Sequence, residues 1–124
     1  MINTSSIAFE APQLLEVASR RGSRPIDLQI VNSAVDGDKL REIQLLEGFA
    51  RKARKCLRVL GEGATGAEVK KVVTGLRNAA LSIGAMRVVG ALEILEMKGN
   101  TTDALASVAA SVLEAELFIL KIAR

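Results

Sequence analysis

The sequence predicts an all-α protein, an antiparallel up-down bundle of four long helices preceded by short N-terminal helices. Apolar residues recur at spacings of three and four along four successive stretches, and no stretch alternates apolar and polar residues as a strand does. The composition agrees, because 49% of the residues are hydrophobic but only 2% are aromatic. A core of Leu, Val, Ile and Ala is typical of packed helices.

The 124 residues are enough for one domain. We expect an N-terminal arm over residues 1–24, in which PQLLEVASRR (residues 12–21) forms a short helix, and a bundle domain over residues 25–124. A second short helix is expected within RPIDLQIVNSAVDGD (residues 24–38), with a break at Gly37.

The first long helix is expected from Asp38 to about Gly61. Its apolar stripe consists of Ile43, Leu46, Ala50, Ala53, Leu57 and Leu60. Cys56 falls within this periodicity and is interpreted as a packing residue rather than a reactive thiol. Four cations lie on the polar side, where we expect a solvated face rather than a phosphate-binding one: Arg51, Arg54, Lys55 and Arg58.

Three further long helices follow. Thr65 and Glu68 stand in the S/T-x-x-E arrangement of a capping box, so the second helix is expected to begin there and to end near Gly84. Gly84 allows either a tight break or a close approach of another helix. The third helix is expected to end at Gly99, and the fourth to begin near Thr101 or Thr102.

Several classes of chemistry are excluded by residue types. The chain has no His and one Cys, so it lacks a histidine acid/base or phosphoryl relay, an ordinary zinc site and an internal disulfide. Glu93 and Glu96 suggest half of a carboxylate metal site, but such sites in bundles use a Glu-x-x-His pattern. We therefore expect neither a metal nor a cofactor, and no enzymatic activity.

Charge and hydropathy indicate a cytoplasmic protein. The net charge of +3 is a weak footprint for a nucleic-acid-binding protein, and no aromatic or groove-reading motif accompanies it. No signal peptide or membrane-spanning run is recognisable, so we expect neither a nucleic-acid nor a membrane partner.

Three segments resemble histidine phosphotransfer (HPt) domains of two-component phosphorelays. RPIDLQIVNSAVDGD is similar to the opening segment of many bacterial members, LLEGFARKARKCLRVL to their long helix, and GLRNAALSIGAMRVVGALEILE to the signature H-x-L-K-G-(S/A)-(S/A)-x-x-(I/L/F)-G-A. The resemblance covers about residues 24–123 and implies an HPt-like four-helix bundle.

The signature departs from the family at its chemical positions. Aligned on Ile83-Gly84-Ala85, Thr74 occupies the position of the phosphoaccepting histidine, Arg77 that of the lysine and Asn78 that of the glycine. A Thr phosphate ester would trap the phosphoryl group, and Thr needs an activating base that this chain cannot supply through His. The resemblance therefore implies an HPt domain with no catalytic residue, one that does not transfer phosphate.

The same helix carries a candidate docking surface. Residues at spacings of three, four and seven form one surface strip: Lys70, Lys71, Thr74, Arg77, Asn78 and Leu81. The resemblance implies that it binds the acidic pocket of a response-regulator receiver domain, or a histidine kinase. An ordinary solvated helix face is the plainer interpretation. The alternative function is a structural or assembly module outside phosphorelay signalling, which self-associates as a homodimer.

Overall fold

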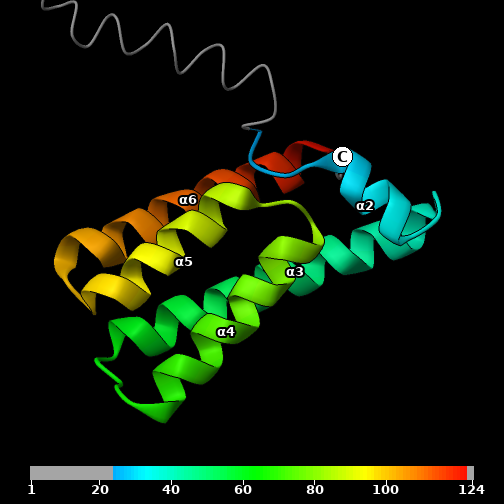
Figure 1. Cartoon of the computed structure of the whole chain (residues 1–124). Coiled ribbons are helices and arrows are strands. Elements are labelled where there is room, and N and C mark those ends of the chain that lie inside the picture. Colours follow the sequence, from blue (N-terminus) through cyan, green and yellow to red (C-terminus); the bar gives the residue numbers. More distant parts are fainter. Residues whose placement is uncertain (1–23, 123–124) are drawn as a thin grey trace, which may run out of the picture.

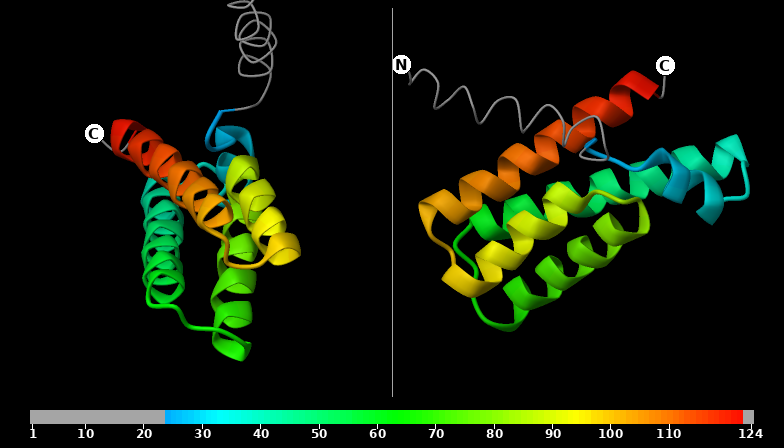
Figure 2. Two further views of the ribbon diagram at one scale, coloured as in Figure 1. Left: turned by 90° about the vertical axis from the view of Figure 1, so that its left-hand side faces the viewer. Right: turned by 45° about the horizontal axis from the view of Figure 1, so that its top comes forward.

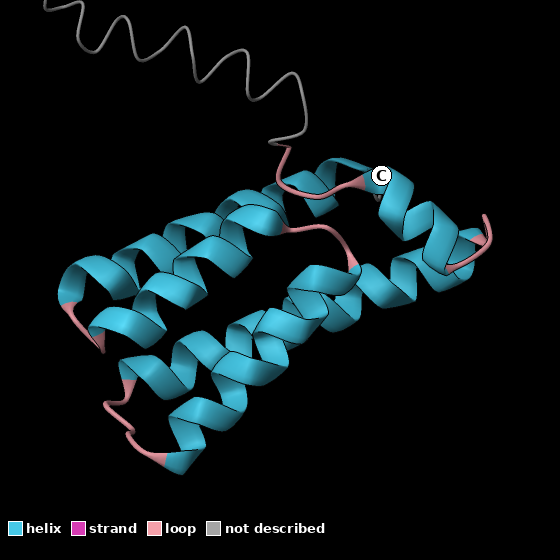
Figure 3. Ribbon diagram, viewed as in Figure 1, coloured by secondary structure: helices cyan, strands magenta, loops and turns pink. Residues whose placement is uncertain are grey.

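The computed structural model describes residues 24–122, which form five helices and no strand (Figure 3). The helices are α2 (Leu28–Ala34), α3 (Lys39–Gly61), α4 (Ala67–Ser82), α5 (Met86–Lys98) and α6 (Thr102–Ile122). Consecutive helices pack antiparallel, so the all-α prediction and the four long helices are confirmed. The helix expected at residues 12–21, with nearly all of the N-terminal arm, lies outside the described residues.

The four longer helices enclose one core. Contacts join α3 to α4, α4 to α5, α5 to α6, and α6 back to α3 (Figure 1). Helices α4 and α6 therefore occupy diagonal corners, as the left view of Figure 2 shows, and within the described bundle their Cα atoms stay more than 8 Å apart. The short α2 packs against α3 and α4.

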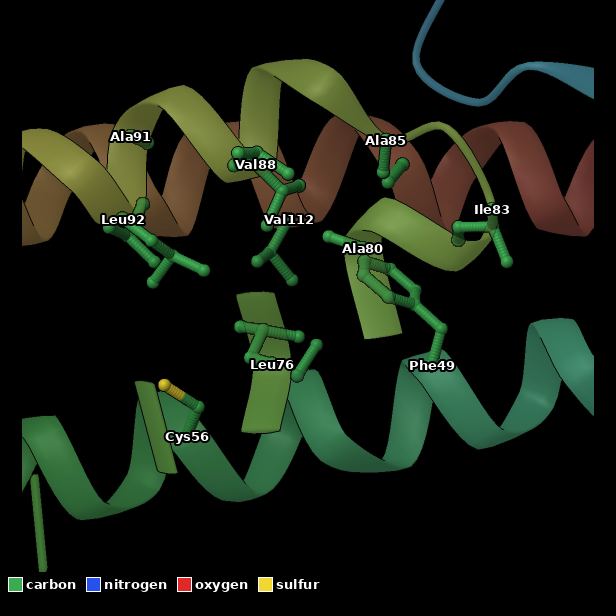
Figure 4. Packing of buried hydrophobic residues seen from close by; sticks show 14 of the residues in the cluster. Phe49, Cys56, Leu76, Ala80, Ile83, Ala85, Val88, Ala91, Leu92 and Val112 are labelled. Atoms are coloured by element: carbon green, nitrogen blue, oxygen red, sulfur yellow. The ribbon is translucent and has the colours of Figure 1, made fainter. Parts of the chain in front are cut away.

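Within residues 24–122, the fully buried core is built from aliphatic side chains, Cys56 and one aromatic ring. Phe49, Leu76, Leu92 and Val112 come one from each long helix, and none is more than 1% exposed. Figure 4 shows Phe49 of α3 pointing toward Ala80 of α4, whose small side chain leaves room for the ring. No polar or charged residue of residues 24–122 is buried. Burial of a large apolar side chain such as Phe49 or Leu92 stabilises the fold by roughly 1.5–3 kcal/mol.

The apolar stripe expected on α3 is rotated relative to the observed one. Ile43 is 37% exposed, while Phe49 and Val59, which the expected stripe omitted, are at most 3% exposed. Helix α3 packs along α4 and meets α6 less extensively, so the side that faces α4 becomes the core side. The interpretation of Cys56 as a packing residue agrees with its complete burial.

The capping box expected at the start of α4 is wrong. The helix begins at Ala67 and its N-cap is Gly66, which has φ +70° and supplies no side-chain hydrogen bond. The left-handed turn at Gly66 moves the first helical residue beyond the register that would bring the Thr65 hydroxyl to the Glu68 N–H. Helix α6 begins at Thr102, as expected, and there the Thr101 hydroxyl accepts a hydrogen bond from the Ala104 N–H at 3.2 Å.

Gly84 serves as both a break and a point of close approach. It has φ +69° between α4 and α5, and a Cβ built there would lie 2.4 Å from the Asp27 Cβ. The Asp27 N–H donates to the Ile83 carbonyl at 3.1 Å. The Asp27 carboxylate also caps α2 by accepting from the Gln29 N–H at 3.0 Å. Only glycine fits a backbone crossing this tight with a positive φ.

Over residues 24–122, the helices lack the combination of length and apolar character that crossing a lipid bilayer requires.

Candidate functional site

The surface strip from Lys70 to Leu81 that the sequence predicts, here named the α4 strip, lies on the side of α4 that faces away from the core. Lys70, Lys71, Asn78 and Leu81 are exposed, and Thr74 is half-buried near the middle of the helix. On the other side, Val73, Leu76 and Ala80 are buried. The structure thus brings all six strip residues together on one helix, with a hydroxyl at the centre, cations toward the N-terminal end and a 46% exposed leucine toward the C-terminal end.

Arg77 is held by a neighbouring helix. Its Nη1 lies 2.6 Å from Oε1 of Glu96 on α5, and the two side chains are 29% and 37% exposed. The guanidinium is therefore turned toward α5 and its charge is matched locally. Glu96, considered from sequence as half of a metal site, instead tethers Arg77. Of the cations on the α4 strip, the two lysines are the ones that face solvent.

A groove between α3 and α4 gathers further lysines beside the strip. It has a volume of about 300 Å³ and is lined by Lys52, Lys55, Glu68, Lys71, Val72, Gly75 and Leu76. Within residues 24–122, none of its three lysines takes part in an ion pair. Glu68 is its one acidic lining residue, so this basic groove carries a net positive charge over an apolar floor.

The basic groove divides the four cations that the sequence placed on one polar side. Lys55 turns toward α4, whereas Arg51 and Arg54 line a different groove, between α3 and α6. The Arg54 Nη1 pairs there with Oε2 of Glu116 at 3.4 Å. All four are exposed, as expected. Sequence reasoning missed Lys52, because only the pairing of α3 with α4 shows that it joins Lys55 and Lys71 across one groove.

The groove between α3 and α6 is larger and more apolar. Its volume is about 390 Å³, and its apolar walls are formed by Ile43, Leu46, Ala50, Ile119, Leu120 and Ile122. It opens on the flank of α6, away from α4, because α4 and α6 stand at diagonal corners. It is therefore separate from the α4 strip.

The described residues offer neither a reactive thiol nor a cluster of metal-ligating side chains. Burial raises the pKa of the Cys56 thiol from 9.0 to about 11, so the thiol stays protonated at neutral pH. Among residues 24–122, no three side chains of the His, Cys, Asp or Glu type gather as a metal site would require. What the α4 strip and the basic groove offer is a surface for electrostatic and apolar contact.

The chain matches no protein-family model, and neither a curated protein nor a solved structure is significantly similar to it. A function has to be inferred from the residues themselves: the hydroxyl at Thr74, the tethered Arg77 and the lysines of the basic groove.

Proposed function

We propose that this chain is a non-catalytic, HPt-like four-helix bundle that binds a response-regulator receiver domain, or a histidine kinase, without passing a phosphoryl group. It would compete with a true phosphotransfer domain for the same face of its partner, or hold that partner in one state. The observation that carries the proposal is the α4 strip, with a threonine at its centre and, beside it, lysines that form no ion pair with any of residues 24–122.

The order and packing of the helices support this proposal. A short helix followed by four antiparallel long helices is the arrangement that the resemblance to HPt domains implies. Two of the resembling segments also touch each other, since Asp27 of RPIDLQIV donates its N–H to Ile83 of the SIGA turn at 3.1 Å. That contact gives the two segments one joint structural role.

Thr74 supports binding without transfer. Its position near the middle of the outer side of α4 would present a reacting group to a partner, but an aliphatic hydroxyl needs a general base and the chain has no His. A histidine-to-aspartate relay passes phosphate through a labile nitrogen–phosphorus bond, which Thr cannot form. An inert group at the centre of a complete docking surface is what a competitor requires.

Electrostatics in the basic groove support an acidic partner. Lys52, Lys55 and Lys71 converge without ion-pair partners in the described structure, so they remain available to carboxylates on another protein. Charge complementarity of this kind raises association rates and fixes orientation. Leu81, 46% exposed, adds apolar contact at the other end of the strip. Arg77 contributes less than its charge suggests, because Glu96 neutralises it.

The test is a calorimetric titration against a panel of receiver domains, with and without the phosphate mimic beryllofluoride. We expect Lys71→Glu to weaken binding by roughly 1 kcal/mol, about fivefold. Lys39→Glu is the matched control, since Lys39 lies at the far end of α3 and the same charge change there should leave affinity unaltered.

A second variant separates binding from chemistry. Thr74→His combined with Asn78→Gly restores the phosphoacceptor and the open glycine of the family pattern, so it should take up phosphate from a phosphorylated receiver while the native chain does not. Absence of binding to every receiver and kinase tested would refute the proposal, and so would phosphate uptake by the native protein.

A further inference from the structure

The outer side of α6 carries a heptad seam. Five residues follow one another at spacings of four, three, four and three, which place them at alternating a and d positions of a coiled coil, and they are here named the α6 seam: Ala106, Ala110, Leu113, Leu117 and Leu120. The buried side of the same helix has its own residues, among them Val108, Val112 and Ala115. Helix α6 is therefore apolar on two sides, and the core accounts for only one of them.

The seam is exposed and free of charge. Leu113, Leu117 and Leu120 are 56%, 56% and 61% exposed. The two carboxylates that flank them are drawn sideways into ion pairs, Glu114 with Arg87 at 2.5 Å and Glu116 with Arg54 at 3.4 Å. Aligned leucines this exposed, with their charged neighbours turned aside, are typical of a helix that packs on a partner helix.

We infer that the α6 seam pairs with the same seam of a second copy of this chain, the two α6 helices running parallel. A seam of a and d residues is self-complementary, which suits the isologous contact of a two-fold dimer. Next to Leu120 the apolar surface continues into the groove between α3 and α6, where Ile43 is 37% exposed. This widens the contact beyond a single helix.

The flanking charges select the parallel orientation. In a parallel pair, a g residue meets the e residue five positions on in the partner, which brings Glu116 opposite Lys121 of the second copy. Arg54 bonds Oε2 of Glu116, which leaves Oε1 for that lysine. In an antiparallel pair, e meets e and g meets g, so Glu116 at a g position would not meet Lys121 at an e position. The ion pair between Glu116 and Lys121 is therefore available only to the parallel pair.

Such a dimer leaves the α4 strip open. Helix α4 lies diagonally across the bundle from α6, so both copies keep their strips and basic grooves on the outside. The dimer would present two docking surfaces at once. A dimer formed through α4 would instead bury the α4 strip, which the protein needs for partner binding.

Sedimentation equilibrium of the full chain tests the pairing. We expect the native protein to have twice the mass of one chain, and Leu117→Glu to reduce the association constant by roughly tenfold or more. Leu81→Glu is the matched control, because it places the same charge on an exposed leucine of α4 and should leave the dimer intact. Far-ultraviolet circular dichroism verifies that both variants keep their helices.

A cross-linking measurement tests the orientation. Parallel helices place Leu113 opposite Leu113, so Leu113→Cys, in a Cys56→Ala background, should form a disulfide-linked dimer under mild oxidation. A native protein that stays monomeric at every concentration would overturn the inference. So would a dimer that persists in Leu117→Glu or dissociates in Leu81→Glu. Failure of Leu113→Cys to cross-link a native-like dimer would overturn the parallel pairing.

Discussion

Helices α4 and α6 stand at diagonal corners of the bundle and contribute equally buried side chains to one core, but their outer sides carry opposite chemistry. Leu76 of α4 and Val112 of α6 are both at most 1% exposed. Outside, α4 shows two solvent-facing lysines around a threonine, whereas α6 shows a row of alanines and leucines. The inner sides of both helices therefore serve the same core, and their different outer sides suit them to different partners.

The difference separates two kinds of association. Exposed lysines beside a shallow apolar floor suit a partner that binds and leaves, because surface charges chiefly speed association and orient it. An uncharged leucine seam suits a lasting contact, because burial of apolar surface supplies most of its free energy. One helix of the bundle would then recognise a signalling partner while the diagonal one joins two copies.

The largest expected effect lies on the inner side of α4. Leu76→Ala removes a fully buried side chain from the shared core, so it should lower the free energy of unfolding by about 3–4 kcal/mol. Leu81→Ala is the same change on the outer side of the same helix, where the side chain is 46% exposed, and should cost about 0.5 kcal/mol or less. Urea unfolding measures both. Equal losses would mean that the two sides of α4 are not distinct.

The turns that follow α4 and precede α6 give the next largest contrast. Gly84→Ala adds a Cβ 2.4 Å from that of Asp27 at a positive φ, so it should destabilise the fold by about 2–3 kcal/mol. Gly99 also has a positive φ, +81°, with ψ −174°, a conformation that essentially only glycine adopts, but a Cβ there meets nothing within 4 Å, so Gly99→Ala should cost less, about 1–2 kcal/mol. Thermal unfolding of the pair isolates the contact with Asp27. A Gly84→Ala protein as stable as Gly99→Ala would contradict the close approach.

The buried Cys56 thiol, which α3 contributes to the shared core, should make the free energy of unfolding fall at alkaline pH. The Cys56 thiol has its pKa raised from 9.0 to about 11 by burial, so in the unfolded chain it ionises first as the pH rises. The folding stability that this thiol contributes is fully present below pH 9.0 and is lost, by about 2 kcal/mol, as the pH approaches about 11. Urea unfolding across this range should show a steeper fall for the native protein than for Cys56→Ala. Parallel curves would mean that Cys56 is accessible to water.

Helices and faces could be predicted from the sequence because they depend on residues a few positions apart. The spacing of apolar residues located all four long helices, and the strip from Lys70 to Leu81 follows from the helical period alone. Helix rotation could not be predicted in the same way: Ile43 was assigned to the core of α3 and Phe49 was not. That choice depends on how closely α3 packs on α4 and α6, which no local pattern encodes.

Contacts between helices are the part of the candidate site that the sequence does not reveal. Lys52 and Lys71 line the same groove only because α3 packs against α4 in one particular register. In the same way, Glu96 meets Arg77 only because α5 packs against α4 in one particular register. The α6 seam is the opposite case, since its heptad spacing is present in the sequence. An apolar stripe that faces the core and an apolar seam that faces a partner have the same spacing in the sequence. Only the burial of each residue tells them apart, so the sequence alone did not identify the α6 seam.

The smallest expected effect concerns the tie between Arg77 and Glu96, which decides how much charge the α4 strip displays. The pair is about a third exposed, so a double-mutant cycle of Arg77→Gln and Glu96→Gln should give a coupling of only about 0.5 kcal/mol in stability. Its effect on binding should be more informative. Glu96→Gln releases the guanidinium toward solvent, so it should strengthen binding to an acidic receiver domain by about twofold to threefold, and more at low salt than at high salt. Glu93→Gln, on the same helix and exposed, is the charge-matched control and should leave affinity nearly unchanged. If Glu96→Gln weakens binding, Glu96 holds Arg77 in its binding position rather than withholding its charge, and α4 recognises its partner with a preformed ion pair.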